Sequence, residues 1–442
     1  MQADLCIHAR WVLPMTGDEQ ILENHSVFIK DGRIVSVLSQ EDSASLAQFS
    51  ATETITLDQH ALLPGYINAH GHAAMSLFRG LADDLPLMTW LQEHIWPAEG
   101  QWVDADFVHD GTQLAMAEML KCGTTTFADM YFYSGDSVQA AIDAGMRTVA
   151  FTPILDFPTN FAKDADEYIS KAMAVHQRYA DEPLATIGLG PHAPYTVSDG
   201  PLKTITELSK KYQIPVQIHC HETAFEVEQS IELLGINPIK RLANLGFFNE
   251  RVSCVHMTQL SADDIAIIKE SGASIVHCPE SNLKLASGFC PAAEILKAGI
   301  TLALGTDGAA SNNDLNLQGE MKTAAMLAKA VANNAAVLPA MQALRVATLG
   351  GAEALGIAHE TGSIEVGKWA DLQAVRLDGL AQTPMYDPAS QLVYTDSSRY
   401  TEYTWVAGQA LMAQGKLTTL DESLLCATAT AWQTRIAQNQ VN

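Results

Sequence analysis

The sequence contains little positive charge, and its cysteines form no recognisable pattern. Among 442 residues, 26 Lys and Arg face 51 Asp and Glu, which gives a formal net charge of −25 at pH 7. With no cluster of basic residues to offset this balance, polyanionic partners such as nucleic acid and anionic membrane surfaces are excluded. The seven cysteines are scattered and form no C-x-x-C pair. This excludes a disulfide framework and a zinc knuckle, and it favours a reducing compartment.

Long hydrophobic runs are also missing. No stretch reaches the roughly 18 consecutive apolar residues that a membrane-crossing helix needs. The first residues lack the basic segment and apolar core of a signal peptide, so we expect a cytoplasmic protein without a membrane partner. With 48 % hydrophobic and only 17 % charged residues, the composition is not that of a disordered chain. The length leaves room for an α/β barrel and a smaller domain.

The two ends of the chain carry strand patterns. Residues 4–9 and 26–30 alternate apolar and polar positions, and Asp31-Gly32 supplies a hairpin turn. Residues 362–375 and 403–412, near the other end of the chain, are also strand-like. We therefore expect a small β-sandwich domain built from both termini, with residues 1–60 and 361–442 as its two parts.

The middle of the chain, residues 61–360, alternates apolar strand-like runs with amphipathic helical stretches. Near-continuous apolar strands are typical of a parallel sheet that is covered on both faces. Eight such strands with helices between them predict a (β/α)₈ TIM-type barrel. The predicted strands are residues 61–70, 124–129, 147–155, 185–192, 216–219, 252–256, 274–278 and 301–307.

Polar residues that can carry chemistry follow five of these strands. In order along the chain they are His70 and His72, His192, the group His219, His221 and Glu222, then His256, and finally Asp307. Because the carboxyl ends of barrel strands face one mouth, we expect these side chains to converge there.

Each of these residues also has a structural interpretation. Asp307 precedes a glycine and could be a turn aspartate. His256 and His277 could be core histidines, and we keep that interpretation for His277. Glu222 could lie in the first turn of the following helix, where the dipole favours a carboxylate. The convergence of these side chains, rather than any one of them, favours a functional site.

Histidines from the first and fifth strands, with the carboxylate from the eighth, suit a zinc or iron ion. His70 and His72 are two residues apart and point the same way along a strand. An ion there would lower the pKa of a bound water from 15.7 toward about 7. His256 and Asp307 would then orient this water and accept its proton, and Glu222 would act as the proton shuttle.

Several segments resemble one known family. They are residues 63–72, 188–195, 219–223, 281–288 and 304–315, which read LPGYINAHGH, GLGPHAPY, HCHET, SNLKLASG and LGTDGAASNNDL. The chain is identified as a member of the amidohydrolase superfamily, in the branch of adenosine-type deaminases and chlorohydrolases. Within this branch it is similar to the 5′-methylthioadenosine/S-adenosylhomocysteine deaminases. The resemblance covers nearly the whole chain.

The resemblance implies a reaction and a metal site. The reaction is hydrolytic deamination at C6 of an adenosine-type nucleoside, which yields the inosine analogue and ammonia. One divalent ion is implied, with Zn²⁺ favoured and Fe²⁺ the alternative, because residues 190–193 lack the lysine of dinuclear relatives. Relatives are often dimers or tetramers, so a homo-oligomer is compatible with the resemblance. The implied metal ligands are His70, His72, His219 and Asp307.

The resemblance also assigns catalytic and substrate-binding roles. His256 would hydrogen-bond the water, and Glu222 would protonate the purine ring. Choosing His219 over His221 as the ligand rests on the family pattern, and we interpret His221 as structural. Glu99 would accept the ribose hydroxyls, which suits an acceptor-only carboxylate.

Two further residues match the substrate pocket of the family. His192 would contact the purine side, with Glu222 and Asp307 also touching the substrate. Trp90 would pack near the sugar or sulfur substituent, or else anchor the core of its loop. Some relatives hold the homocysteine carboxylate with an arginine at the end of the third strand. Here Arg147 begins that strand instead, which argues against recognition of a homocysteine carboxylate and leaves 5′-methylthioadenosine and adenosine in play. The sequence leaves open which of the three nucleosides is preferred.

Two alternatives remain open from the sequence. The first keeps the metal site but acts on a free base such as guanine or cytosine, or on a triazine. The second is a catalytically inactive barrel that serves as a scaffold, which predicts missing ligands.

Overall fold

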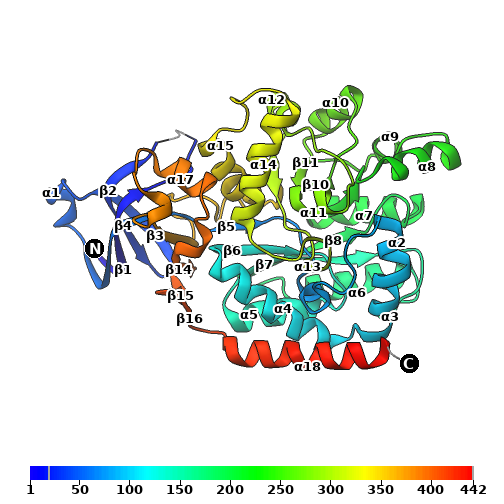
Figure 1. Ribbon diagram of the computed structural model, residues 1–442, viewed down its shortest axis with the longest axis horizontal. Helices are drawn as coiled ribbons and strands as arrows, with labels where there is room; N and C mark the ends of the chain where they lie inside the picture. Colours follow the sequence, from blue (N-terminus) through cyan, green and yellow to red (C-terminus); the bar gives the residue numbers. More distant parts are fainter. Residues whose placement is uncertain (18–19, 441–442) are drawn as a thin grey trace.

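The computed structural model describes residues 1–17 and 20–440. Residues 18, 19, 441 and 442, which belong to the predicted terminal domain, lie outside the described residues. One of two eight-stranded sheets forms a barrel enclosed by helices, and the other lies at one end of it (Figure 1). The barrel strands are β5 (Tyr66–Asn68), β6 (Thr124–Asp129), β7 (Arg147–Ile154), β8 (Ala185–Pro191), β9 (Val216–Cys220), β10 (Val252–His256), β11 (Ser274–His277) and β12 (Leu302–Leu304).

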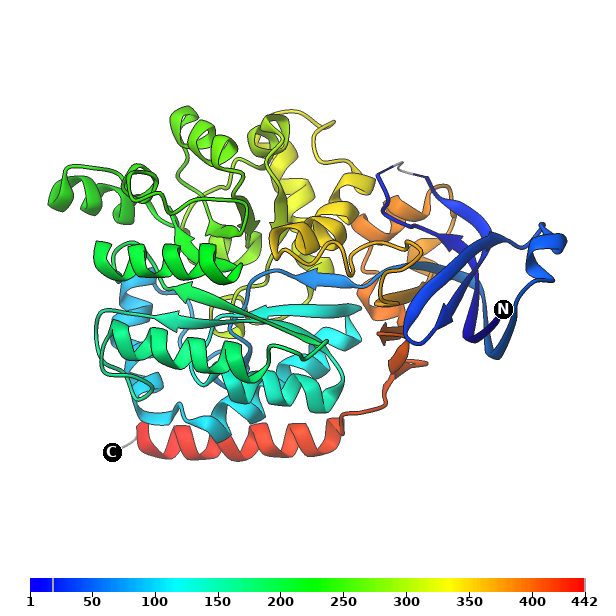
Figure 2. The same ribbon diagram turned by 180° about the vertical axis from the view of Figure 1, so that it is seen from behind.

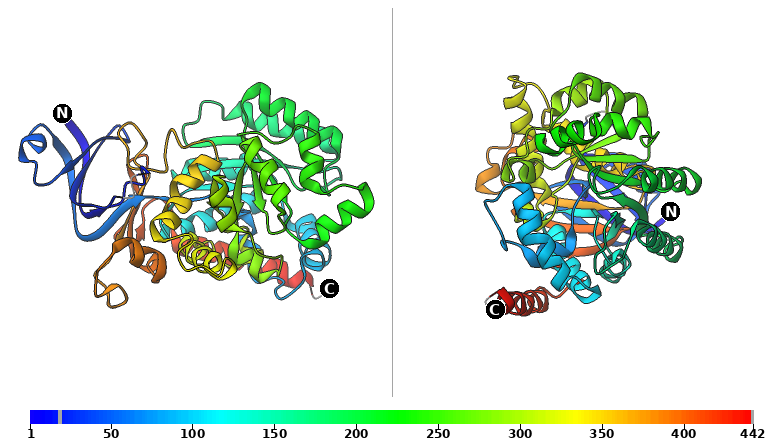
Figure 3. Two further views of the ribbon diagram at one scale, coloured as in Figure 1. Left: turned by 90° about the horizontal axis from the view of Figure 1, so that it is seen from above. Right: turned by 90° about the vertical axis from the view of Figure 1, so that its right-hand side faces the viewer.

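The barrel strands pair in parallel in chain order, from β5 to β12. Backbone hydrogen bonds close the ring between its first and last strands. Ala69 N donates to Leu304 O at 2.8 Å, and Asp307 N donates to His70 O at 3.1 Å. These contacts confirm the predicted (β/α)₈ barrel, whose strands lie inside a ring of helices when viewed from the side of the molecule opposite the second sheet (Figure 3).

Helices follow the strands and cover the outside of the barrel. Two of them, α8 (Ala224–Leu234) and α10 (Ala262–Ser271), start at a capping side chain and end at a left-handed glycine. At α10, Ser261 forms a capping box with Asp264, and Gly272 ends the helix. The α-helices longer than five residues are α3 (Trp96–Trp102), α4 (Ala105–Lys121), α5 (Ser134–Ala144), α6 (Ala165–Arg178), α7 (Asp199–Tyr212), α8 (Ala224–Leu234), α9 (Pro238–Asn244), α10 (Ala262–Ser271), α11 (Pro279–Lys284), α12 (Ala292–Ala298), α14 (Leu317–Val331), α15 (Ala340–Arg345), α17 (Pro388–Tyr394) and α18 (Glu422–Gln440).

The second sheet contains strands from both ends of the chain, as predicted. Its strand order is β16-β15-β14-β13-β4-β1-β2-β3, so β4 lies between a strand from each end. One face buries apolar residues from both parts, including Ile7 and Trp405. The strands are β1 (Gln2–Val12), β2 (Leu22–Lys30), β3 (Arg33–Ser39), β4 (Ser50–Pro64), β13 (Leu372–Arg376), β14 (Thr401–Val406), β15 (Gln409–Ala413) and β16 (Lys416–Leu417).

The first predicted barrel strand, residues 61–70, is in fact divided between the two sheets. Its first part ends β4 of the terminal sheet, and its second part is β5. The division falls at Gly65, whose N–H donates to Asp371 O in the terminal sheet, while Tyr66 N donates to Gly123 O beside the barrel. A side chain on Gly65 would collide with Thr125, because its Cβ would lie 2.1 Å from Cγ2. Glycine therefore allows the chain to pass directly between the sheets.

The end of the chain returns to the barrel. Helix α18 runs along its outside, at the lower edge in Figures 1 and 2. Trp432 Nε1 donates to Asp110 Oδ2 at 2.8 Å, and its ring packs against Phe107 of α4. The residue boundaries between the two predicted domains stay a prediction. No helix within the described ranges is both long and apolar enough to cross a membrane.

Candidate active site

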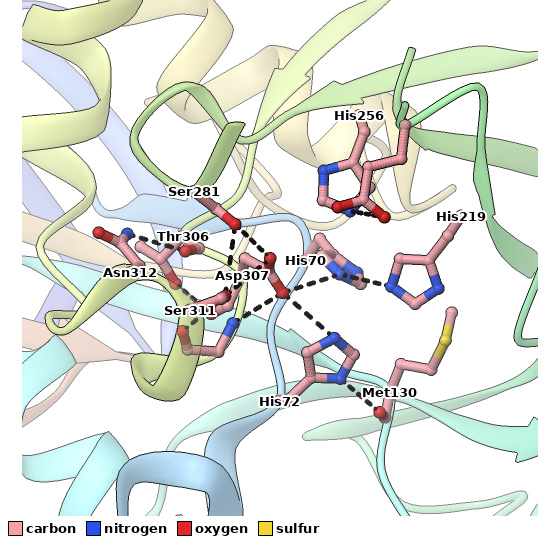
Figure 4. A network of polar contacts seen from close by, with 12 residues as sticks. His70, His72, Met130, His219, His256, Ser281, Thr306, Asp307, Ser311 and Asn312 are labelled. Carbon is pink, nitrogen blue, oxygen red and sulfur yellow. Dashed lines mark hydrogen bonds and ion pairs between the residues drawn. The ribbon is translucent and has the colours of Figure 1, made fainter. Parts of the chain in front are cut away.

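Three histidines and one aspartate meet at the carboxyl end of the barrel (Figure 4). One ligand atom of each of His70, His72 and His219 lies within 4.8 Å of those of the other two. Asp307 Oδ1 lies 3.2 Å from His72 Nε2 and 3.6 Å from His70 Nε2. His219 Nε2 lies 3.2 Å from His70 Nε2. The first, fifth and eighth strands thus direct four potential donor atoms toward one point.

The outer nitrogen of each histidine is held by an oxygen acceptor. His70 Nδ1 donates to Gln217 Oε1, His72 Nδ1 to Met130 O, and His219 Nδ1 to His192 O, each at 2.7 Å. These bonds leave the Nε2 lone pairs directed inward. Burial lowers the pKa of His70 and His219, which favours the neutral form that binds metals. Together with one carboxylate, this donor set fits a divalent ion.

Asp307 is fixed by hydrogen bonds from short side chains. Ser281 Oγ and Ser311 Oγ donate to its Oδ2 at 2.6 and 2.9 Å, and Gly308 N donates to Oδ1 at 2.8 Å. These contacts turn Oδ1 toward the histidines. Ser281 and Ser311 belong to two of the segments that carry the family resemblance, residues 281–288 and 304–315, so those segments orient the carboxylate.

Beside this cluster lie His256 and Glu222. His256 Nδ1 donates to Asn282 Oδ1 at 2.9 Å, and its Nε2 lies 3.8 Å from Glu222 Oε2. Burial and the negative charge of Asp307 raise the pKa of Glu222 to about 8. Helix α8 has Thr223 as its N-cap, so Glu222 precedes the helix. The interpretation of Glu222 as a first-turn residue is therefore wrong.

His221 points away from the cluster. Its Nδ1 donates to Gln259 O at 2.7 Å, and its Nε2 accepts from Ile239 N at 3.4 Å. The backbone of His221 has a φ of +50°, so the chain leaves the strand direction there. Both nitrogens are thus used within the protein, in line with a structural role. His277, the last residue of β11, is buried as expected of a core histidine, but it is not a satisfied one, because its Nδ1 has no hydrogen-bond partner among the described residues.

A cavity of about 400 Å³ opens above the cluster, and Glu99, Trp90 and His192 line it. Glu99, on α3, accepts a hydrogen bond from Tyr131 OH at 2.7 Å. Its withdrawal from water raises the pKa of Glu99 to about 7. His192 Nδ1 lies 3.1 Å from Thr196 Oγ1. The predicted substrate residues therefore line the same cavity as three of the predicted metal ligands, His72, His219 and Asp307.

One known protein family matches this chain. The model of the amidohydrolase family matches residues 61–411. This chain belongs to the amidohydrolase family. The match covers the barrel and continues into the terminal sheet, so it includes all of the strand-end residues described above.

Relatives of this amidohydrolase share nearly its full length. It is 50 % identical to a 5-methylthioadenosine/S-adenosylhomocysteine deaminase of Saccharophagus degradans, over 98 % of this chain and 97 % of that protein. A protein of the same name from Teredinibacter turnerae is 46 % identical over 98 % of both. The crystal structure of an adenosine deaminase from Xanthomonas campestris with bound zinc has a TM-score of 0.97 and 46 % identity, covering 99 % of each chain.

Aromatic side chains form part of the wall of the amidohydrolase cavity. Trp96, Phe157 and Phe161 line it, and within the described residues the cavity wall has neither lysine nor arginine. Arg147 lies at the opposite end of β7. There its Nε donates to Asp371 Oδ2 at 2.7 Å in a buried ion pair with the terminal sheet.

Sequence reasoning missed several residues of this amidohydrolase site. Tyr131, which holds Glu99, follows β6 by two residues, so the strand-end pattern that identified the histidines could have found it. Gln217 and Asn282 hold ring nitrogens of His70 and His256. Nothing in their local sequence indicates those contacts.

Proposed function

We propose that this amidohydrolase deaminates an adenosine-type nucleoside at C6 and releases the inosine analogue and ammonia. The observation that carries this proposal is a four-donor cluster whose His72, His219 and Asp307 line one cavity together with a protonatable Glu222 and a carboxylate at Glu99. The names of its relatives support it, because two are 5-methylthioadenosine/S-adenosylhomocysteine deaminases and one is an adenosine deaminase. An inactive scaffold would lack ligands, whereas this chain has all four.

His70, His72, His219 and Asp307 would hold one divalent ion, with Zn²⁺ favoured by their donor atoms and Fe²⁺ the alternative. The zinc in the Xanthomonas campestris relative supports this choice. When bound, such an ion lowers the pKa of water toward about 7 and supplies a nucleophile at neutral pH.

The protein's own residues would move the protons. Glu222, whose raised pKa keeps it protonated near pH 7, donates a proton to a purine ring nitrogen while C6 gains its bond to the water oxygen. His256 donates through Nδ1 to Asn282, so its Nε2 is free to accept a hydrogen bond from the attacking water. The attacking oxygen gives up two protons as C6=O forms. One passes through Asp307 or Glu222 to the amino group, so that the C6–N bond breaks and ammonia leaves, and the other restores the acid form of Glu222.

Substrate contacts follow from the cavity walls. Glu99 accepts hydrogen bonds from the ribose hydroxyls, His192 lies on the purine side, and Trp90 packs near the sugar or its 5′ substituent. The aromatic lining residues Trp96, Phe157 and Phe161 suit a methylthio group, and a homocysteine carboxylate would find no cation among the described lining residues. We therefore expect kcat/KM for 5′-methylthioadenosine and adenosine to exceed that for S-adenosylhomocysteine by about tenfold or more.

The test is a substrate screen with the metal-loaded protein. Ammonia release and the ultraviolet absorbance change would be followed for the three nucleosides, with guanine and cytosine as free-base controls. Turnover of at least one nucleoside, with weaker activity on the free bases, is the expected result. No turnover of any adenosine nucleoside by protein with a verified metal content would overturn the proposal.

A further inference from the structure

Helix α8 buries a carboxylate and exposes its apolar side chains. Of its residues, all of which the structure describes, Glu226 is the only one that is buried, at 5 % exposure. Phe225 and Leu233 on the same helix are 51 % and 71 % exposed. Burying a carboxylate costs free energy unless hydrogen bonds compensate. The placement of Glu226 therefore needs an explanation beyond the packing of the helix.

The explanation lies in its two hydrogen bonds. Glu226 Oε1 accepts from His221 N at 3.1 Å, and Oε2 accepts from Glu222 N at 2.8 Å. In a capping box, an acidic residue three positions after the N-cap accepts from the N–H of the N-cap residue. Here the N-cap is Thr223, and Glu226 reaches past it to the two preceding residues. Its carboxylate thus holds the turn before the helix.

That turn is strained, and it is held from the opposite side as well. His221 has a φ of +50°, in the left-handed region that non-glycine residues seldom adopt. Thr258 Oγ1 donates to Glu222 O at 2.6 Å, and Thr258 N donates to His221 O at 2.9 Å. The peptide groups on both sides of Glu222 are therefore fixed, and its side chain extends into the cavity.

We propose that Glu226 is a positioning residue that fixes the backbone from which the acid/base Glu222 reaches the substrate. This inference rests on the proposed function. Glu226 does not line the main cavity, where Glu99 and His192 would bind the nucleoside. Loss of its carboxylate should therefore displace the proton donor and lower kcat, while KM changes little. Small displacements of a reacting group can cost about 100-fold in rate.

The experiment compares Glu226→Ala and Glu226→Gln with Glu228→Gln, which makes the same substitution at an exposed position of the same helix. We would measure kcat and KM for 5′-methylthioadenosine, the metal content and the melting temperature. In addition, amide hydrogen exchange would be measured over residues 219–223. For Glu226→Ala we expect kcat to fall about 10- to 100-fold, KM to stay within about twofold, and exchange to accelerate. Glu226→Gln keeps one hydrogen-bond acceptor, so its kcat should fall less than that of Glu226→Ala. The kcat of Glu228→Gln should match that of the wild type.

Two results would overturn the inference: an unchanged kcat in Glu226→Ala, or a loss of kcat that comes with an equal rise in KM and loss of metal. If Glu226→Ala does not fold, Glu226→Gln decides by the same criteria. If the wild type turns over no nucleoside, the proposed function has failed. The exchange measurement then still tests whether Glu226 holds the turn, because it does not depend on activity.

Discussion

Replacing Glu99 by Gln should weaken the use of ribonucleosides by about 10- to 100-fold in kcat/KM. Tyr131 OH donates to Glu99 Oε1 at 2.7 Å, which leaves Oε2 and the remaining lone pair of Oε1 for the sugar. A hydrogen bond to a charged group contributes about 1.5–3 kcal/mol. Because about 1.4 kcal/mol corresponds to a tenfold change, loss of one such bond gives the stated range. The amide of Gln keeps one hydrogen-bond acceptor, so the loss of kcat/KM should stay within this 10- to 100-fold range.

The assay compares adenosine with 2′,3′-dideoxyadenosine for the wild type and the variant. The dideoxy substrate lacks both hydroxyls, so its kcat/KM should already be low and should not fall further in Glu99→Gln. Metal content should be equal in both proteins, because Glu99 is outside the donor cluster. An equal loss on both substrates would refute the assignment of Glu99 to the ribose.

Three further outcomes can be measured. The pKa of Glu99 is raised to about 7, so KM for adenosine should rise as the pH falls below about 7 and the carboxylate is protonated, while KM for the dideoxy substrate should not follow. His219→Ala should lose the metal ion in elemental analysis, whereas His221→Asn, which tolerates a positive φ, should keep it. Arg147→Met should lower the free energy of unfolding in denaturant by about 3–5 kcal/mol, because it leaves buried Asp371 unpaired, and should leave kcat unchanged.

Each of these outcomes has a clear counter-result. A pH dependence shared by both substrates would place the titrating group elsewhere than at the sugar. Metal loss in the His221 variant alone would exchange the roles of the two histidines. A change of less than about 1 kcal/mol in the Arg147 variant, the range of an exposed pair, would mean that the ion pair with Asp371 does not hold the two sheets together.

The architecture was predictable because buried strands appear in the sequence as runs of apolar residues or as alternating apolar and polar residues. Eight apolar runs predicted the barrel, and alternating segments at both ends predicted the second sheet. The division of residues 61–70 at Gly65 was not predictable in this way. The end of β4 and all of β5 are buried, so the apolar run continues across the boundary. The boundary becomes visible only in the structure, in the hydrogen bonds of Gly65 and Tyr66 and in the close approach of Gly65 to Thr125.

The candidate site, like the fold, was only partly predictable from the sequence. Strand-end position identified the residues that meet at the mouth, because the barrel brings all carboxyl ends together. Strand-end position could not decide whether His219 or His221 is the metal ligand, because residues two apart in a strand point to the same face. The left-handed backbone at His221 turns its ring toward Gln259 instead. Contacts such as that of Glu226 with Glu222 depend on how a helix packs after a turn, which residue spacing does not encode.

The hydrogen bond from Asp307 N to His70 O lies where the barrel ring closes. The cluster therefore cannot assemble until the last strand has docked beside the first, because its donors come from both sides of that junction. An ion held there would link the first and last strands of the barrel, and it would bind the folded chain more tightly than the unfolded chain. Part of its binding free energy would thus appear as stability of the whole barrel, and chelation would loosen the junction between the first and last strands before the rest of the molecule.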